Sequence, residues 1–291
     1  MQLPAPGSVC HTAAMIREEH VLNEIHAYRY AGDDARYALV ISHGIASHGA
    51  IYDVFCCHHA AKGVDIWSYD APGHGKSTTN RPRGQWTLGE WAEASVMYAE
   101  HVKATTGLPV FTLGSSLGVA AAYSSLHSDA VSGAVLMGSP VVPSGPAVAM
   151  AAPVWKSEQV QAVLSMVGRA ARLDCGILFN FDEDYGYAGA GEQKRLDPWN
   201  TWSYDLSSWA TLFTYEPQVP VSENAKPILV ACGEKDASFP PAMMKAVADG
   251  IAGPVEFYCL EDGKHQLMLF HTETFSDKVD GWVGDRLDEG C

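Results

Sequence analysis

Basic residues are scarce in this chain relative to acidic ones. The 291 residues include 19 Lys and Arg against 34 Asp and Glu, which gives a formal net charge of −15 at pH 7. Excess negative charge repels the phosphate backbone of nucleic acids and the anionic surface of membranes. The composition therefore argues against a nucleic-acid-binding protein, and we expect no nucleic-acid partner.

Long apolar runs are missing as well. No stretch has the length and apolar character needed to span a bilayer as a helix. The segment from Met1 to His20 contains Pro4, Pro6 and Gly7 instead of the sustained apolar core of a signal peptide. We therefore expect no integral membrane segment and predict a cytoplasmic protein.

Cysteines are few and irregularly spaced. The chain has 7 of them, an odd number without repeated spacing, which is typical of reduced thiols and not of a disulfide framework. The run Cys56-Cys57-His58-His59 has the residue types of a zinc site. Structural zinc ligands normally come in separated pairs, however, and adjacent residues of a helix point in different directions. We therefore predict no metal site and no cofactor.

What the sequence does contain is a regular alternation of apolar strands and helical patterns. Strands are expected at 37–42, 64–69, 110–113, 133–138, 227–233 and 255–260. The segment 37–42 is continuously apolar, as is typical of a strand covered on both faces, and 133–138 is expected to be another buried strand. A half-buried antiparallel strand is expected at 21–30, where polar and apolar residues alternate. Helices are expected at 52–62, 88–102 (behind a capping box of Thr87 and Glu90), 241–250 and from about 266. This order predicts an α/β protein with a mostly parallel, doubly wound sheet.

The alternation stops between Pro140 and Pro220. That segment has no clear strand pattern and is rich in aromatic residues. We interpret it as a helical cap at 140–220, inserted between the two parts of the core, 1–139 and 221–291. Some of its aromatic side chains should line a substrate pocket, but the sequence does not identify which.

One motif indicates a specific chemical role. Gly114-Ser115-Ser116-Leu117-Gly118 lies between an apolar run and a helix of small residues, which is the context of a Gly-x-Ser-x-Gly nucleophile elbow. We predict Ser116 as the nucleophile and the amide of Leu117 as one donor of an oxyanion hole. The second donor is expected at Ile45, because Gly44 before it lets the backbone approach a ligand closely.

A serine nucleophile needs a base and a group that orients the base. Polar residues at the carboxyl ends of parallel strands gather at one edge of a sheet. Of the 12 histidines, His265 follows the last predicted strand, and Asp236 follows the strand before it. Glu234 and Asp262 compete with Asp236 for the orienting role. The predicted triad is Ser116, Asp236 and His265, in the chain order used by α/β-hydrolases.

On these motifs the chain resembles the α/β-hydrolase superfamily and, more narrowly, the monoacylglycerol-lipase-like group of lysophospholipases and esterases. The matching residues are His43-Gly44 with Ser47-His48-Gly49 and Tyr52, the segment 70–77 (DAPGHGKS), the elbow 114–118, Asp236 and His265. The resemblance implies an α/β-hydrolase fold with an inserted cap, a Ser-His-Asp triad and an oxyanion hole.

The expected function is therefore a serine hydrolase that cleaves a carboxylic ester or lactone of a moderately lipophilic small molecule through an acyl-enzyme. The same triad would also serve an amide, thioester or carbon–carbon bond hydrolase or an acyltransferase. A protein of another class, a non-catalytic ligand-binding α/β-hydrolase-like protein, remains open because a fold does not determine a function. The sequence also leaves a homodimer open.

Overall fold

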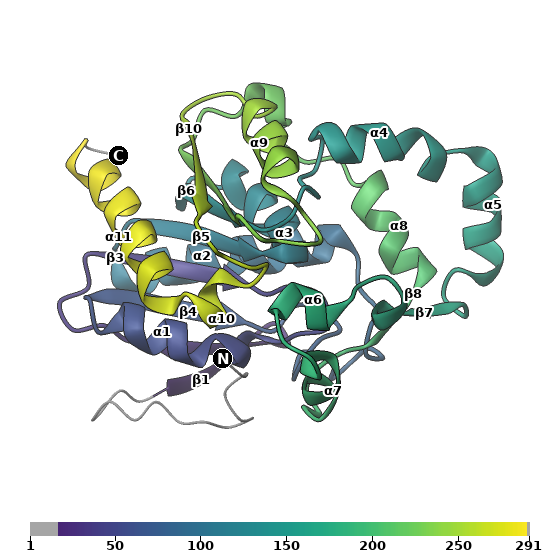
Figure 1. The fold of residues 1–291 in the computed structure, drawn as a ribbon, viewed down its shortest axis with the longest axis horizontal. Helices are drawn as coiled ribbons and strands as arrows, with labels where there is room; N and C mark the ends of the chain where they lie inside the picture. Colours follow the sequence, from purple (N-terminus) through teal and green to yellow (C-terminus); the bar gives the residue numbers. More distant parts are fainter. Residues whose placement is uncertain (1–16, 290–291) are drawn as a thin grey trace.

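The computed structural model describes residues 17–289 and is built on one eight-stranded sheet (Figure 1). Its strand order is β1-β2-β4-β3-β5-β6-β9-β10, and all neighbouring pairs are parallel except β1 with β2 and β2 with β4. The strands are β1 (Arg17–Leu22), β2 (Ile25–Tyr30), β3 (Tyr37–Ser42), β4 (Val64–Tyr69), β5 (Val110–Ser115), β6 (Val131–Met137), β9 (Ile228–Gly233) and β10 (Val255–Leu260). The predicted mostly parallel, doubly wound sheet is confirmed.

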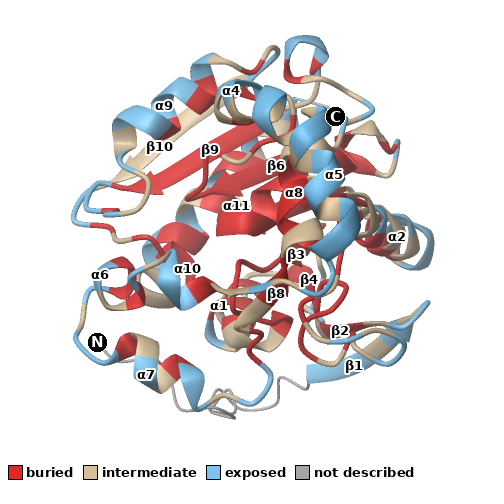
Figure 2. Cartoon of the chain, turned by 90° about the vertical axis from the view of Figure 1, so that its right-hand side faces the viewer, coloured by how far each residue is buried: buried red, intermediate tan, exposed pale blue. Residues whose placement is uncertain are grey.

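Helices cover both faces of this sheet. Those outside residues 140–220 are η1 (Gly49–Tyr52), α1 (Asp53–Ala60), α2 (Leu88–Thr106), η2 (Ser116–Gly118), α3 (Val119–Ser124), η3 (Ser125–His127), η5 (Val221–Glu223), α9 (Pro241–Asp249), α10 (Leu267–Phe270) and α11 (Thr272–Asp288). Side chains alternate along β3, so Leu39 packs in the cluster with α1 and α11, while Val40 packs in the cluster with α2 and α3. Figure 2 shows the buried strands between helices with exposed outer faces.

The prediction of a single strand at 21–30 was wrong. The segment 21–30 is not one strand, because β1 and β2 form an antiparallel hairpin that turns at Asn23 and Glu24. Both turn residues have positive φ, 44° and 71°. Such a turn normally contains a glycine, often as Asn-Gly. Here a glutamate takes the second position, so the sequence pattern does not indicate a turn.

The inserted segment 140–220, which we call the cap, is mainly helical. It consists of α4 (Pro146–Trp155), α5 (Glu158–Val167), β7 (Arg172–Asp174), η4 (Cys175–Ile177), α6 (Phe181–Tyr185), α7 (Ala190–Arg195), β8 (Ser203–Asp205) and α8 (Leu206–Thr214). The segment has no clear strand pattern in its sequence, but it contains two short strands, β7 and β8, which pair antiparallel. Each is only three residues long, which is too short to produce a recognisable alternation.

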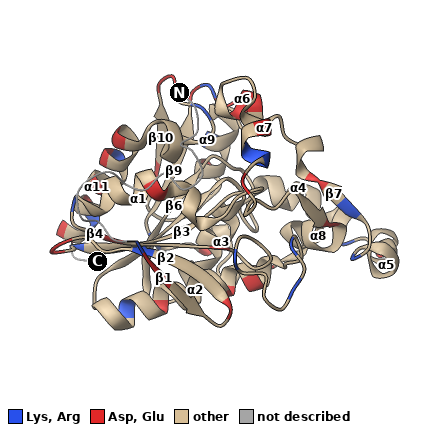
Figure 3. Ribbon diagram, turned by 90° about the horizontal axis from the view of Figure 1, so that it is seen from below, with Lys and Arg blue, Asp and Glu red and all other residues tan. Residues whose placement is uncertain are grey.

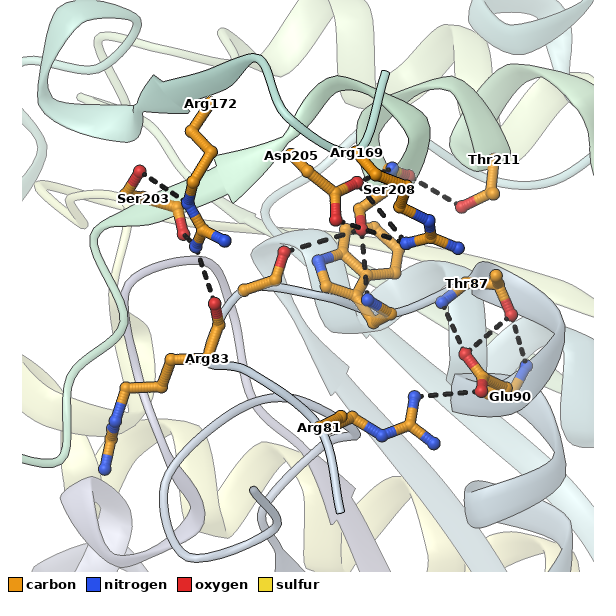
Figure 4. Close-up of polar contacts among 12 residues, drawn as sticks. Arg81, Arg83, Thr87, Glu90, Arg169, Arg172, Ser203, Asp205, Ser208 and Thr211 are labelled. Atoms are coloured by element: carbon orange, nitrogen blue, oxygen red, sulfur yellow. Dashed lines mark hydrogen bonds and ion pairs between the residues drawn. The ribbon is translucent and has the colours of Figure 1, made fainter. Parts of the chain in front are cut away.

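Side-chain hydrogen bonds attach the cap to the loop before α2 (Figure 4). Ser208 Oγ accepts a hydrogen bond from the Trp86 amide, and Thr211 Oγ1 accepts one from the Leu88 amide, both at 3.0 Å. A Cβ at Gly84 would lie 2.0 Å from the Ser203 carbonyl oxygen, so the two backbones touch. The first turn of α2 and the cap are thus held together by groups that would otherwise be unpaired.

Charged residues are spread over many elements, and neither sign gathers on one face in Figure 3. Within residues 17–289, no helix has the length and apolar character required to cross a membrane. The cytoplasmic location stays a prediction.

Candidate active site

Ser116 lies in a strained turn at the carboxyl end of β5. Its φ is +51°, a left-handed conformation that costs a non-glycine residue about 1–2 kcal/mol. The glycines around it are required by space: a Cβ at Gly118 would lie 2.2 Å from the Ser42 carbonyl oxygen, and one at Gly114 would lie 2.5 Å from the Gly118 carbonyl oxygen. The strand end and the helix start are therefore packed backbone against backbone, which turns the serine side chain outward.

The structure brings Ser116, His265 and Asp236 together from three strand ends. Ser116 Oγ lies 3.0 Å from His265 Nε2, and His265 Nδ1 lies 2.8 Å from Asp236 Oδ2. An ionised carboxylate can only accept, so Nδ1 carries a proton and Nε2 is free to accept one from the serine. The second carboxylate oxygen of Asp236 accepts hydrogen bonds from the amides of Ser238 and Phe239. This carboxylate is buried, and its oxygens bond the imidazole and the two amides.

The two competing carboxylates lie elsewhere. Glu234 accepts a hydrogen bond from the Asp262 amide, and Asp262 forms an ion pair with Lys235. Both residues are exposed. The geometry thus separates Asp236 from Glu234 and Asp262, a choice that the sequence alone left open.

The cap contributes a second carboxylate, which sequence reasoning missed. Asp184, in α6, accepts a hydrogen bond from the His265 amide through its backbone carbonyl (3.3 Å). Its side chain accepts one from Ser238 Oγ at 2.5 Å. Asp184 is 4% exposed, so its charge acts in a poorly solvated environment. No motif marks Asp184, because only the docking of the cap on the core places it beside the histidine.

These carboxylates control the protonation of His265. Burial by itself disfavours the imidazolium, but the hydrogen bond to Asp236, its charge and the charge of Asp184 outweigh burial and raise the pKa of His265 above its ordinary value. The interactions that raise the pKa of His265 also stabilise the protonated imidazole that forms when a serine transfers its proton to this base.

The pH profile of activity should report this arrangement. Catalysis by His265 requires the neutral imidazole, so kcat/KM should fall on acidification through a pKa above the ordinary imidazole value. Asp184→Asn removes a charge that favours the imidazolium, so the acid limb should move to lower pH. The measurement is kcat/KM against pH for both proteins. Glu183→Gln, an exposed charge change on the same helix, should leave the limb in place, and an unshifted limb in Asp184→Asn would contradict the role of Asp184.

The predicted oxyanion donors lie beside the serine. A Cβ on Gly44 would be 2.9 Å from the Ser116 Cβ, so the loop after β3 passes against the elbow. The Ala71 amide donates to His43 Nε2, which leaves His43 Nδ1 to donate to the Gly44 carbonyl oxygen at 2.8 Å. A trans peptide points its N–H opposite to its C=O. The Ile45 amide is therefore turned away from His43, and none of the hydrogen bonds of the described residues is donated by it.

His43 and the cap hold this loop in place. Complete burial keeps the pKa of His43 well below its ordinary value, so its ring stays neutral and can accept from the Ala71 amide. Ala46 has a φ of +51°, and its amide donates to the hydroxyl of Tyr204 in the cap at 3.0 Å. The cap is thus part of the scaffold of the predicted oxyanion hole and does more than cover it.

Residues 17–289 contain no group of three or more His, Cys, Asp or Glu side chains placed to hold a metal ion. In the segment Cys56-Cys57-His58-His59, both ring nitrogens of His59 form hydrogen bonds inside the fold, with Tyr37 Oη at 2.6 Å and with Ser276 Oγ at 2.8 Å. Cys56 and Cys57 are buried in α1. This segment packs α1 against α11.

Comparison with solved structures identifies the class of fold. The chain is similar to a monoglyceride lipase from Saccharomyces cerevisiae (TM-score 0.71, 16% identity, 96% of this chain and 97% of that chain). It is also similar to a carboxyl esterase from Bacillus coagulans (0.70, 17%, 93% and 99%) and to an enol-lactonase from Burkholderia xenovorans (0.63, 18%, 92% and 100%). Together with the topology, these similarities define an α/β-hydrolase fold.

The family follows from a match to the sequence itself. Residues 33–272 match the model of the family described as serine aminopeptidase, S33, and the chain belongs to that family. It is accordingly a serine hydrolase. Comparison with the curated proteins gives no match.

Proposed function

We propose that this protein hydrolyses a carboxylic ester or lactone of a moderately lipophilic small molecule, with Ser116 as nucleophile, His265 as general base and Asp236 as the group that orients the histidine. The observation that carries the proposal is the chain of contacts from Ser116 Oγ through His265 to Asp236, at 3.0 and 2.8 Å. Nucleophile and base are within direct proton-transfer distance, as this chemistry requires.

In the first half of the reaction, Ser116 Oγ attacks the substrate carbonyl carbon and its proton passes to His265 Nε2. The negative charge that develops on the carbonyl oxygen is met by the amides of Ile45 and Leu117, which need no reorganisation because the strand ends hold them. His265 then returns the proton to the oxygen of the leaving alcohol. The bond between carbonyl carbon and alcohol oxygen breaks, and an acyl-Ser116 ester remains.

In the second half, water takes the place of the alcohol. His265 Nε2 removes a proton from the water as its oxygen attacks the acyl carbon, and the same two amides hold the oxyanion. Collapse of the tetrahedral species expels Ser116 Oγ, which recovers its proton from His265. The carboxylic acid is released, or, from a lactone, the hydroxy acid.

Amide hydrolysis is a second candidate on the same triad, because the family description names an aminopeptidase. An amide needs protonation of a more basic leaving group, which the His265 imidazolium could supply. Esters and lactones are preferred here because the named activities of the similar structures include a monoglyceride lipase, an esterase and an enol-lactonase.

A substrate panel distinguishes these reactions. We expect the purified protein to hydrolyse short 4-nitrophenyl esters and lactones with kcat/KM far above that for aminoacyl 4-nitroanilides, and a fluorophosphonate probe to label Ser116. Mass spectrometry of the labelled peptide identifies the serine. Preferential anilide cleavage would favour the amide hydrolase, and the absence of both labelling and turnover in folded protein would favour the non-catalytic ligand-binding alternative.

A further inference from the structure

Lys194, in α7 of the cap, is a buried cation without an acceptor. Only 3% of its surface is exposed. Among the described residues, no ion pair and no hydrogen bond is made by its ammonium. Its neighbour Arg195 is exposed but engaged, since it pairs with Asp174 at 2.9 Å and stacks on Trp202 at 3.8 Å. Buried charges in proteins are normally paired, so a ligand with a negatively charged acceptor could supply the partner that this ammonium lacks.

The surroundings of Lys194 are mostly apolar. Its Nζ lies 5.8 Å from the ring centroids of both Phe181 and Tyr185, at the outer limit of a cation–π contact. Burial lowers the pKa of Lys194 to about 8, partly opposed by the nearby Cys175 and Asp197. The carboxylate of Asp197 is itself bound by His48 Nε2 and by the Trp199 amide, both at 2.9 Å. The ammonium thus faces two aromatic rings, a thiol and a carboxylate that has other partners.

The position of Lys194 links it to the candidate active site. Its charge acts on His43, the residue that orients the peptide of the predicted oxyanion hole. Tyr185, one of the rings beside its Nζ, also packs against Phe270 of α10, which follows His265 closely in the chain. Asp184, next to Tyr185 in α6, contacts the His265 backbone. Lys194 therefore lies in the part of the cap that packs on residues next to the candidate active site.

From this arrangement we infer that Lys194 binds a carboxylate on the substrate, so that the preferred substrate is an ester or lactone whose acyl part ends in a carboxylate. The inference rests on the proposed function and adds the substrate class to it. A carboxylate supplies both the charge and the hydrogen-bond acceptor that the ammonium lacks. The rings of Phe181 and Tyr185 would pack on the methylene groups between carboxylate and ester. The same ammonium would repel a protonated amino terminus, which places a free α-amine at a disadvantage.

Two nearly isosteric esters test the inference. In 4-nitrophenyl hydrogen glutarate, a carboxylate takes the place of the terminal methyl group of 4-nitrophenyl pentanoate. We expect the wild-type protein to favour the glutarate ester in kcat/KM by about tenfold or more, the worth of a hydrogen bond to a charged group. Lys194→Met should abolish the preference by raising KM for the glutarate ester, so that the two esters become equal in kcat/KM. A charge-keeping Lys194→Arg variant should restore part of the preference.

The matched control is Lys245→Met, which removes an exposed lysine that pairs with Asp249 on α9. It changes the net charge equally and should keep the preference. Equal kcat/KM for the two esters in the wild-type protein, with activity dependent on Ser116, would overturn the inference and leave the proposed function standing. Retention of the preference by folded Lys194→Met would overturn it too.

A binding measurement without turnover distinguishes a failure of the inference about Lys194 from a failure of the proposed function. In calorimetric titrations, monomethyl glutarate should bind the Ser116→Ala variant and not the Ser116→Ala/Lys194→Met double variant, because only the former retains the ammonium. If neither ester is hydrolysed, the proposed function fails, and this titration still decides the inference: binding that depends on Lys194 supports it, and no binding to either variant overturns it.

Discussion

Replacement of Ser116 by alanine is expected to lower kcat/KM for the best ester of the panel by a factor on the order of 10⁴ or more, because the proposed acyl-enzyme forms on the Ser116 hydroxyl. The loss should appear in kcat, and the variant should still bind substrate and products. Steady-state kinetics measure both quantities. The fold should not suffer, since the change removes one hydroxyl, 7% exposed, from a strained turn.

Ser115 provides the matched control. It is the adjacent serine and is fully buried, and its hydroxyl lies 3.3 Å from Gln266 Oε1. Among the hydrogen bonds of the described residues, none joins it to the His265 ring. Ser115→Ala removes the same atom one position away and should cost less than about tenfold in kcat/KM, the range of a single lost neutral hydrogen bond. If Ser116→Ala kept ester hydrolysis close to the wild-type rate, the nucleophile would have to be sought elsewhere.

Replacement of Gly118 by alanine should strongly destabilise the protein. The added Cβ would lie 2.2 Å from the Ser42 carbonyl oxygen and 2.6 Å from that of His43, and both are backbone atoms that cannot rotate away. We expect the free energy of unfolding to fall by about 3 kcal/mol. Activity should fall as well, because the displaced strand end carries the loop of the predicted oxyanion hole. Denaturant unfolding and ester kinetics measure the two effects.

Gly281 provides a control for the steric effect of the added methyl group at Gly118. Gly281 lies on the exposed face of α11, and a Cβ there would meet nothing within 4 Å. Gly281→Ala should therefore stabilise the protein by about 0.5–1 kcal/mol through helix propensity. If Gly118→Ala were as stable as the wild type, the close packing of the elbow against β3 would be refuted.

The sheet could be predicted well from local patterns. The bounds expected for β3, β4 and β10 agree with the structure, and the capping box of Thr87 and Glu90 is present at the start of α2. β3 and β4 are buried, β10 is half-buried and α2 is capped, and each of these properties is visible in the order of apolar and polar residues. The hairpin between β1 and β2 was missed because its turn has no glycine, and β7 and β8 were missed because strands of three residues leave no period.

The residues of the candidate site could be predicted where a polar side chain follows the end of a strand. Ser116, Asp236 and His265 each follow a strand of the sheet, and parallel strands bring their carboxyl ends to one edge. Asp184 and Lys194 could not be found this way. They lie on short cap helices whose sequence has no motif, and their importance arises from what the cap meets when it docks.

The sequence by itself was enough to predict the class of protein and to single out the serine of the elbow, because Gly-x-Ser-x-Gly between a strand and a helix is a local pattern with a local steric cause. Only the tertiary structure shows that Asp236, and neither Glu234 nor Asp262, contacts the His265 ring. All three carboxylates lie in the loops after β9 and β10, and they differ in whether the backbone turns them toward His265. The tertiary structure also placed Asp184 beside His265 and left Lys194 buried without a partner. Burial and proximity between distant segments set these electrostatic properties, and neither is encoded in the spacing of residues along the chain.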